Sequence, residues 1–184
     1  LYRSLNEESK RLIHLVERME QLKEWDHVST QTYIKKSPTD MKELVEQSVE
    51  MFRWALTEAN IEVDMDVQSS ILLINSSSIA QVISNLLDNA IRYYEGEEPI
   101  RIKGLELAGE YRFSVTGPGK TISSSEKDQL FERFYRIDDA GSRDSGGSGL
   151  GLAISKEIIE QHQGKIGMTS ERDVHTFWFS LPRG

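Results

Sequence analysis

The sequence of 184 residues lacks cysteine altogether and contains only 4 prolines. The absence of cysteine excludes disulfide bonds, thiolate zinc sites and a cysteine nucleophile. Long hydrophobic runs are missing too, since the longest, such as Ile71 to Ile74, fall far short of a membrane span. Charged residues from Arg3 onward do not fit a signal peptide. Because the first residue is not Met, we expect Leu1 to lie inside a longer natural chain.

Basic residues are scarce relative to acidic ones, with 22 Lys and Arg against 30 Asp and Glu, so the net charge is −8. The imbalance is greatest over residues 40–98, where 12 acids accompany only Lys42, Arg53 and Arg92. This surplus disfavours nucleic acid as a partner, because non-specific binding of nucleic acid needs a basic surface. The simplest interpretation of the segment is a solvated acidic face.

Residues 1–26 are predicted to form one helix with a heptad seam. Such a seam buries itself against another helix rather than a sheet. We therefore expect a partner helix that is missing from this fragment, or a second copy of the chain. The alternative is that the helix packs on its own globular body. The seam consists of Leu1, Leu5, Leu12, Leu15, Met19 and Leu22.

The rest of the sequence predicts a mixture of helices and strands. Ser37 is a suitable cap and Pro38 a suitable first residue for a helix that extends to about residue 59. Strands paired by hairpins, with helices on one face of the sheet, indicate an α+β fold. The long irregular stretch at 117–149 is typical of a functional lid. Periodicity predicts helices over 76–94 and 150–161, strands over 61–66, 100–107, 111–116, 165–170 and 175–181, and a short buried strand over 71–74.

The predicted helix 76–94 carries a polar stripe. Asn85 and Asn89 are four residues apart and share one face, and Arg92 and Tyr93 continue it. Amide oxygens can ligate Mg²⁺, a guanidinium suits phosphate oxygens, and an aromatic face suits a base. A polar face that hydrogen-bonds a neighbouring loop explains this stripe equally well when it is taken alone.

Three further segments have residue types that suit phosphate or a flat ligand. Residues 147–152 (GSGLGL) precede a predicted helix, where small residues let backbone N–H groups approach an anion. Gly117 and Gly119 flank Pro118 and allow the backbone to bend under a flat ligand, although a plain turn has the same signature. Residues 131–136 place arginines beside aromatic residues, where they can reach phosphate when a loop closes.

In this order, these segments resemble the catalytic ATP-binding domain of two-component sensor histidine kinases. The superfamily includes type II topoisomerases, the ninety-kilodalton chaperones and mismatch-repair ATPases. The resemblance covers residues 31–182, and the helix before it is similar to the second helix of the dimerisation and phosphotransfer domain. The matching segments are QVISNLLDNAIRYY (81–94, N box), TGPG (116–119, tail of the G1 box), LFERFYR (130–136, F box), GGSGLGLAISKEIIEQHQGKI (146–166, G2 box) and HTFWFSLP (175–182, closing strand).

The resemblance implies a two-layer α/β sandwich, with a mixed sheet covered on one face by helices, over residues 31–184. It implies a partial dimerisation helix at 1–30 and an ATP lid at about 117–149. ATP and Mg²⁺ are the implied cofactors, with Asn89 as the metal ligand and with Asn85 and Arg136 in catalytic roles. The residues implied to bind the nucleotide are Asn85, Asn89, Arg92, Tyr93, Gly117, Gly119, Arg136, Gly147, Gly149, Leu150, Gly151, Leu152 and Thr176.

The resemblance also implies phosphotransfer in preference to hydrolysis. Hydrolysing members of the superfamily carry a Glu base at the place of Asn85, whereas an amide has no useful basicity. The implied acceptor is a histidine on the first dimerisation helix, which this sequence lacks, and His14 does not have the acceptor's neighbours. The implied partners are a response regulator and a second copy of the chain in a homodimer. The implied location is the cytoplasmic side of a protein anchored in the bacterial cell membrane.

One position departs from the family pattern. The G1 box normally reads Asp-x-Gly-x-Gly, and its Asp accepts a hydrogen bond from the adenine amino group, but Val115 stands there in this sequence. Losing a hydrogen bond to a charged acceptor costs about 1.5–3 kcal/mol, or about ten- to hundred-fold in affinity. Thr116 or Thr176 offers a partial substitute. The alternative function is therefore a degenerate regulatory or dimerisation module that binds nucleotide weakly or not at all.

Overall fold

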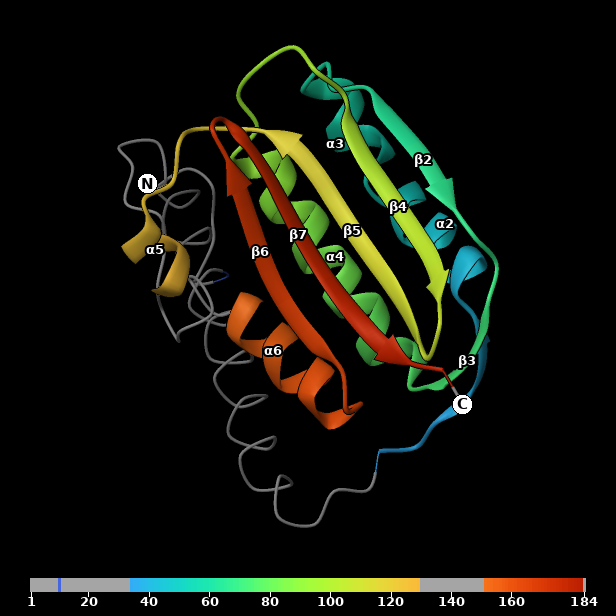
Figure 1. Cartoon of the computed structure of the whole chain (residues 1–184). Helices are drawn as coiled ribbons and strands as arrows, with labels where there is room; N and C mark the ends of the chain where they lie inside the picture. The colour runs from blue at the N-terminus through green and yellow to red at the C-terminus, as the bar shows by residue number, and fades with distance from the viewer. Residues whose placement is uncertain (1–9, 11–33, 130–150, 184) are drawn as a thin grey trace.

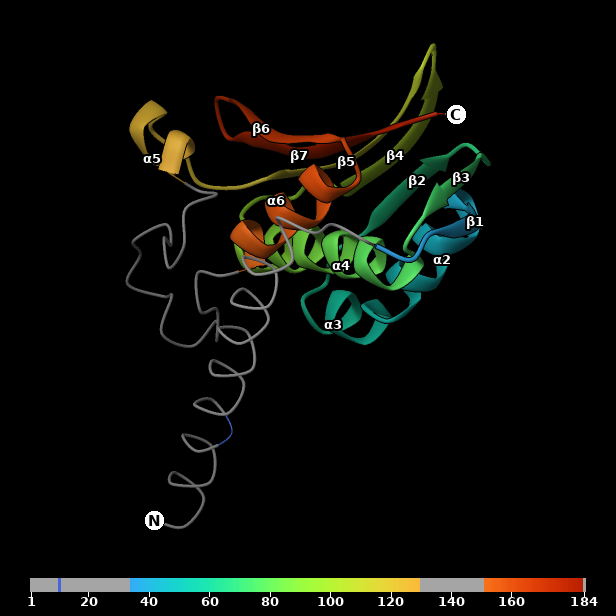
Figure 2. The same cartoon turned by 90° about the horizontal axis from the view of Figure 1, so that it is seen from below.

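A computed structural model describes residue 10 and residues 34–129 and 151–183 (Figure 1). A five-stranded sheet forms one layer, and helices cover one of its faces (Figure 2). The predicted two-layer α+β architecture is therefore confirmed. The elements are β1 (Ser37–Asp40), α2 (Met41–Glu50), α3 (Arg53–Glu58), β2 (Val63–Val67), β3 (Ile71–Ile74), α4 (Ser76–Arg92), β4 (Ile100–Leu107), β5 (Glu110–Pro118), α5 (Ser124–Gln129), α6 (Gly151–Gln161), β6 (Lys165–Glu171) and β7 (Val174–Pro182).

The main sheet has the strand order β2-β4-β5-β7-β6. Hairpins join β4 to β5 and β6 to β7, as predicted, and β5 pairs with β7 in antiparallel register. The exception is β2, which pairs with β4 in parallel. The pairing is parallel because α4, between the two strands in the chain, runs back along the sheet, so that β4 starts at the same end as β2 (Figure 1). A separate two-stranded ribbon joins β1 to β3.

The core lies between the helices and the inner face of the sheet. Alternate strand residues point toward the helices, and Phe113 and Phe179 meet there with ring centroids 5.1 Å apart. α4 presents an apolar face to the same core, as its helical spacing predicts. The buried strand residues include Ile100, Ile102, Tyr111, Phe113, Val115, Phe177, Phe179 and Leu181.

The prediction of a single helix from Pro38 to about residue 59 is wrong in two respects. Residues 37–40 form a strand, and Asp40 is the N-cap, since its side chain accepts a hydrogen bond from the Lys42 N–H. Pro38 is tolerated because it lies in a short two-stranded ribbon. The helix also breaks at Phe52, whose N–H donates to Val49 O and redirects the chain into α3. Apolar spacing continues across such a break and does not reveal it.

Two smaller expectations also need correction. The strand at 71–74 is only half buried, because Ile71 and Leu73 are 65% and 63% exposed. The stretch at 117–149 is not wholly irregular, because β5 continues to Pro118 and α5 occupies 124–129. The predicted helix at 1–26 lies outside the described residues except for position 10. Within the described ranges, no helix is long and apolar enough to cross a membrane.

His162 ties the end of α6 to the start of α4. Its side chain is buried, its Nε2 accepts from the Asn75 N–H at 3.1 Å, and its Nδ1 donates to Ile158 O at 2.8 Å. Asn75 in turn caps α4 and donates to Lys35 O. Burial lowers the pKa of His162, so the imidazole is neutral and fits both partners.

This arrangement predicts a pH dependence of stability. Because the folded state disfavours the protonated ring, the unfolded chain binds more protons below about pH 6.5, and stability falls as the pH decreases from there. In urea titrations at pH 7.5 and 5, we expect His162→Gln to cost about 1–3 kcal/mol at pH 7.5. The variant should then lose less stability than the natural chain on acidification. An equal loss in both proteins would contradict the assignment.

Candidate functional site

Asn85 of α4 is placed against the start of α6. Its Nδ2 donates to Gly151 O at 3.0 Å and to Ser155 Oγ at 3.1 Å, and Ser155 Oγ donates to Gly151 O. Ser155 is fully buried, so these bonds hold the two helices in one register. The side-chain amide nitrogen is thus committed to the protein.

Asn89 lies one turn further along α4. Its Nδ2 donates to Asn85 O at 3.0 Å, so its amide nitrogen is also turned toward the protein. This orientation leaves an amide oxygen on each asparagine as the atom that suits a cation. No cluster of three His, Asp or Glu side chains suited to a metal occurs within 34–129 or 151–183. The donor set therefore fits Mg²⁺, which accepts few protein ligands and keeps waters and phosphates, and does not fit a transition-metal cage.

Arg92 and Tyr93 end the polar stripe. The Arg92 guanidinium pairs with Asp88 at 2.5 Å, and the Arg92 side chain is 19% exposed. Tyr93 is the C-cap of α4 and packs partly buried against the core. To bind a ligand, the Arg92 guanidinium therefore either contacts it while still paired with Asp88 or breaks that ion pair.

Gly117 and Gly119 meet the end of α4. Gly119 forms a bridge with Tyr94, and the Glu95 N–H donates to Pro118 O at 3.1 Å. A Cβ at Gly119 would lie 2.9 Å from Tyr93 O, so only glycine fits that approach. The Gly119 N–H donates to Asp173 O at 2.8 Å, which fixes the point where the chain leaves the sheet.

Val115 and Thr176 lie on opposite faces of the sheet. Val115 is fully buried on the face that carries the helices. Thr176 pairs in register with Thr116, and the two hydroxyls are 2.9 Å apart on the other face. The structure therefore brings neither threonine beside Val115.

His175 is a buried polar residue at this position that the sequence analysis did not select. It shares the helix-facing side with Val115, lies opposite Gly117, and hydrogen-bonds Ser170 Oγ at 2.8 Å and the carbonyl of Lys120. A Cβ at Gly119 would also approach the His175 ring. Strand alternation with Phe177 would have predicted that this imidazole points inward. Asp88 and Ser155 were missed as well. The i,i+4 spacing of Asp88 and Arg92 could have indicated their pair, whereas the contact of Ser155 with Asn85 depends on the packing of two helices.

The structure thus brings together one part of the predicted site and leaves another part undescribed. α4 and the residues just after it join the start of α6 to the end of β5. Asn85 contacts Gly151, and Tyr94, which follows α4, contacts Gly119. Leu152 is buried in the core at the start of α6. Arg136, Gly147, Gly149 and Leu150 lie outside the described residues.

Comparison with known proteins identifies relatives of the whole chain. The profile of the family described as "Histidine kinase-, DNA gyrase B-, and HSP90-like ATPase" matches residues 74–184. The sensor protein kinase WalK of Staphylococcus epidermidis is 33% identical over 179 residues. That alignment covers 96% of this chain and 29% of WalK, so the chain spans less than a third of this relative.

Solved structures agree with the profile. The histidine kinase AdeS of Acinetobacter baumannii superposes with a TM-score of 0.82 at 24% identity, over 100% of this chain and 84% of that one. A mycobacterial sensor histidine kinase, MprB, superposes with a TM-score of 0.69 at 26% identity, over 80% and 97% of the two chains. At the identity of AdeS, the likeness shows the fold alone.

Proposed function

The chain belongs to the family of histidine kinase-, DNA gyrase B- and HSP90-like ATPases, as a catalytic domain of the histidine kinase kind, and we propose that it binds Mg-ATP and donates the γ-phosphoryl group to a histidine. We infer that the acceptor lies on the first dimerisation helix of a histidine kinase. The histidine nitrogen attacks the γ-phosphorus, the bond from that phosphorus to the β,γ-bridging oxygen breaks, and ADP leaves. The phosphoryl group then passes to an aspartate of a response regulator.

The arrangement of α4 supports this proposal. Asn89 would hold Mg²⁺ through its amide oxygen, with Asn85 beside it, and Mg²⁺ neutralises charge on the phosphates. The start of α6 at Gly151 is adjacent to Asn85, and the N-terminal end of a helix is where backbone N–H groups bind phosphate. Gly117, Gly119 and Tyr93 would line the base. Thr176, which was predicted as a further contact, has its hydroxyl beside Thr116 on the other face of the sheet and does not fit that group. Arg92, Arg136, Gly147, Gly149, Leu150 and Leu152 complete the predicted set.

The wider activity belongs to a protein longer than this chain. The relatives named above are sensor kinases, and from them we infer a homodimer formed through the N-terminal helix and a cognate response regulator. We also infer a parent protein anchored in the bacterial membrane with this domain on the cytoplasmic side. The identity of Asn85 favours transfer to histidine over hydrolysis, because an amide is not a general base.

The observation that carries the proposal is the pair of asparagines whose nitrogens face the protein. Calorimetric titration of the 184-residue chain with ATP, with and without Mg²⁺, tests it. We expect saturable binding that weakens without Mg²⁺. No saturable binding up to about 1 mM ATP, which corresponds to about −4 kcal/mol, would contradict the proposal.

A second candidate function rests on the burial of Val115. An apolar, fully buried side chain at the adenine-reading position supplies no acceptor, and Arg92 already has a partner in Asp88. The domain would then act as a regulatory or dimerisation module that binds nucleotide weakly or not at all. In that case the titration above shows no binding, and restoring the acid at position 115 restores it.

A further inference from the structure

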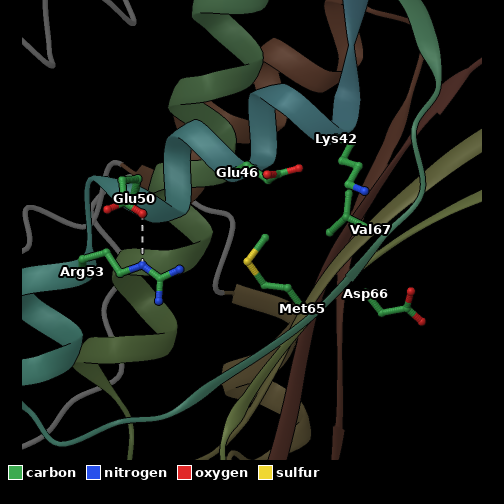
Figure 3. A pocket seen from close by; sticks show the side chains of 7 residues that line it. All are labelled: Lys42, Glu46, Glu50, Arg53, Met65, Asp66 and Val67. Atoms are coloured by element: carbon green, nitrogen blue, oxygen red, sulfur yellow. Dashed lines mark hydrogen bonds and ion pairs between the residues drawn. The ribbon is translucent and has the colours of Figure 1, made fainter.

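A groove lies between α2, α3 and the edge strand β2, away from α6. It has a volume of about 380 Å³ and is open to solvent. Figure 3 shows the Met65 side chain projecting from β2 into the groove, with Glu46 and Glu50 on the helix above it. The groove therefore has an apolar floor and a charged rim. Its lining consists of Lys42, Glu46, Glu50, Arg53, Met65, Asp66 and Val67.

β2 presents a free backbone edge beside this groove. It is an outer strand of the sheet, and its hydrogen bonds to β4 include Ile100 N–H to Glu62 O and Gln68 N–H to Gly104 O. In a parallel pair of strands, every second residue directs both its N–H and its C=O toward the neighbouring strand. In β2 these are the even-numbered residues, as the bonds of Glu62 and Gln68 to β4 show. The N–H and C=O groups of residues 63, 65 and 67 therefore point away from β4, and no described residue hydrogen-bonds them.

The side chains of β2 divide by face. Met65 and Val67 point toward the helices, whereas Asp66 points away in Figure 3, and Asp64 shares its parity. Both acids are exposed. A strand added at this edge would place alternate side chains beside the apolar floor and the others beside the acids.

The strand already paired with β2 indicates which sequence suits it. β4 alternates apolar and basic residues, and its register sets Arg101 opposite Asp64 and Lys103 opposite Asp66. Opposite charges on facing strand positions stabilise a pair, whereas like charges destabilise it. The free edge offers the same two acids to a second neighbour. A second copy of the chain that paired β2 with β2 would instead bring acids against acids.

From this geometry we propose that the free edge of β2 binds an extended segment of a partner protein in which apolar and basic residues alternate. The segment adds a sixth strand to the sheet through the backbone groups of residues 63, 65 and 67. Its apolar side chains enter the groove over Met65, and its basic side chains meet Asp64 and Asp66. The proposal does not depend on nucleotide binding.

The test uses the capped peptide Ser-Val-Arg-Val-Lys-Val-Ser and the isotope-labelled 184-residue chain. In an NMR titration we expect saturable shifts of the amides of residues 63–67. A peptide with Glu in place of its Arg and Lys is expected not to bind. If the acidic peptide binds equally, if the shifts fall on β6, or if the basic peptide does not bind, the proposal is overturned.

Variants of the chain separate the parts of the interaction. Neutralising both acids with Asp64→Asn and Asp66→Asn should weaken binding about five- to ten-fold. Glu171→Gln removes an exposed acid from β6, at the opposite edge, and should leave binding unchanged. Met65→Pro removes an outward N–H together with the side chain at the floor of the groove and should abolish binding, with circular dichroism as the check of folding. Equal binding by the doubly neutralised chain, or loss of a chain dimer in Met65→Pro by sedimentation, would overturn the proposal.

Discussion

Val115→Asp is expected to lower the free energy of unfolding by about 3 kcal/mol or more at pH 7, while it raises the affinity for ATP about ten- to hundred-fold. The side chain at 115 is completely buried among apolar neighbours. A carboxylate there loses its hydration, and no described cation faces it. Bound adenine would supply the missing donor, so ATP should recover part of the lost stability.

The stability cost of this variant should depend on pH. Burial raises the pKa of a carboxyl group above its value in the unfolded chain, so the folded variant binds more protons. Stability relative to the natural chain then falls as the pH rises above about 4, the unfolded value. Urea titrations at pH 4.5 and 7, each with and without Mg-ATP, measure both effects.

Val115→Thr is the matched control for Val115→Asp. It preserves the branched shape and adds a hydroxyl without charge, so it should bind ATP little better than the natural chain. If Val115→Asp remains folded and its ATP affinity equals that of Val115→Thr, then the residue at position 115 does not hydrogen-bond the adenine. His175 would become the next group to test, since it lies on the same face opposite Gly117.

Asn89→Ala is expected to reduce the affinity for Mg-ATP at least about 100-fold, because even outer-sphere partners of a metal ligand contribute 10- to 100-fold. The substitution removes one hydrogen bond within α4, from Asn89 Nδ2 to Asn85 O. The fold should therefore lose about 1 kcal/mol or less. Calorimetry with Mg²⁺ and ATP varied independently separates metal binding from nucleotide binding.

Two further variants complete the test of Asn89. Asn89→Asp keeps an oxygen in place and should retain more Mg²⁺-dependent binding than Asn89→Ala. Ser77→Ala changes an exposed residue in the first turn of the same helix and should have no effect. If Asn89→Ala binds Mg-ATP within about threefold of the natural chain, the metal assignment is wrong and the polar stripe is structural.

The elements with a clear periodicity were predictable from the sequence. Periodicity correctly placed the helix at 76–94 and the strand at 111–116, and the structure buries the apolar face of each. These patterns are local, because each records which side of one element is buried. The family match strengthened them, since the boxes lie in a fixed order along the chain.

Features that depend on distant segments were not predictable in this way. The strand at Ser37–Asp40 exists because β3 pairs with it, and the sequence 37–40 alone resembles a helix start. Ser155 contacts Asn85 only because α4 and α6 pack together. His175 gains its position from the register of β5 and β7. Local patterns do not encode such pairings.

The two anchor points on either side of residues 120–150 bear on how much that part of the chain can vary in length. Gly119 is fastened to Asp173 and Gly151 to Asn85, so both ends of the segment are held by the packed body. The entropy of closing a connection between two fixed points grows only with the logarithm of its length, and a doubling costs about 0.6 kcal/mol. A change of length between the two anchors therefore adds little closure entropy, and the bonds at Gly119 and Gly151 that fix the end of β5 and the start of α6 do not involve the inserted or deleted residues.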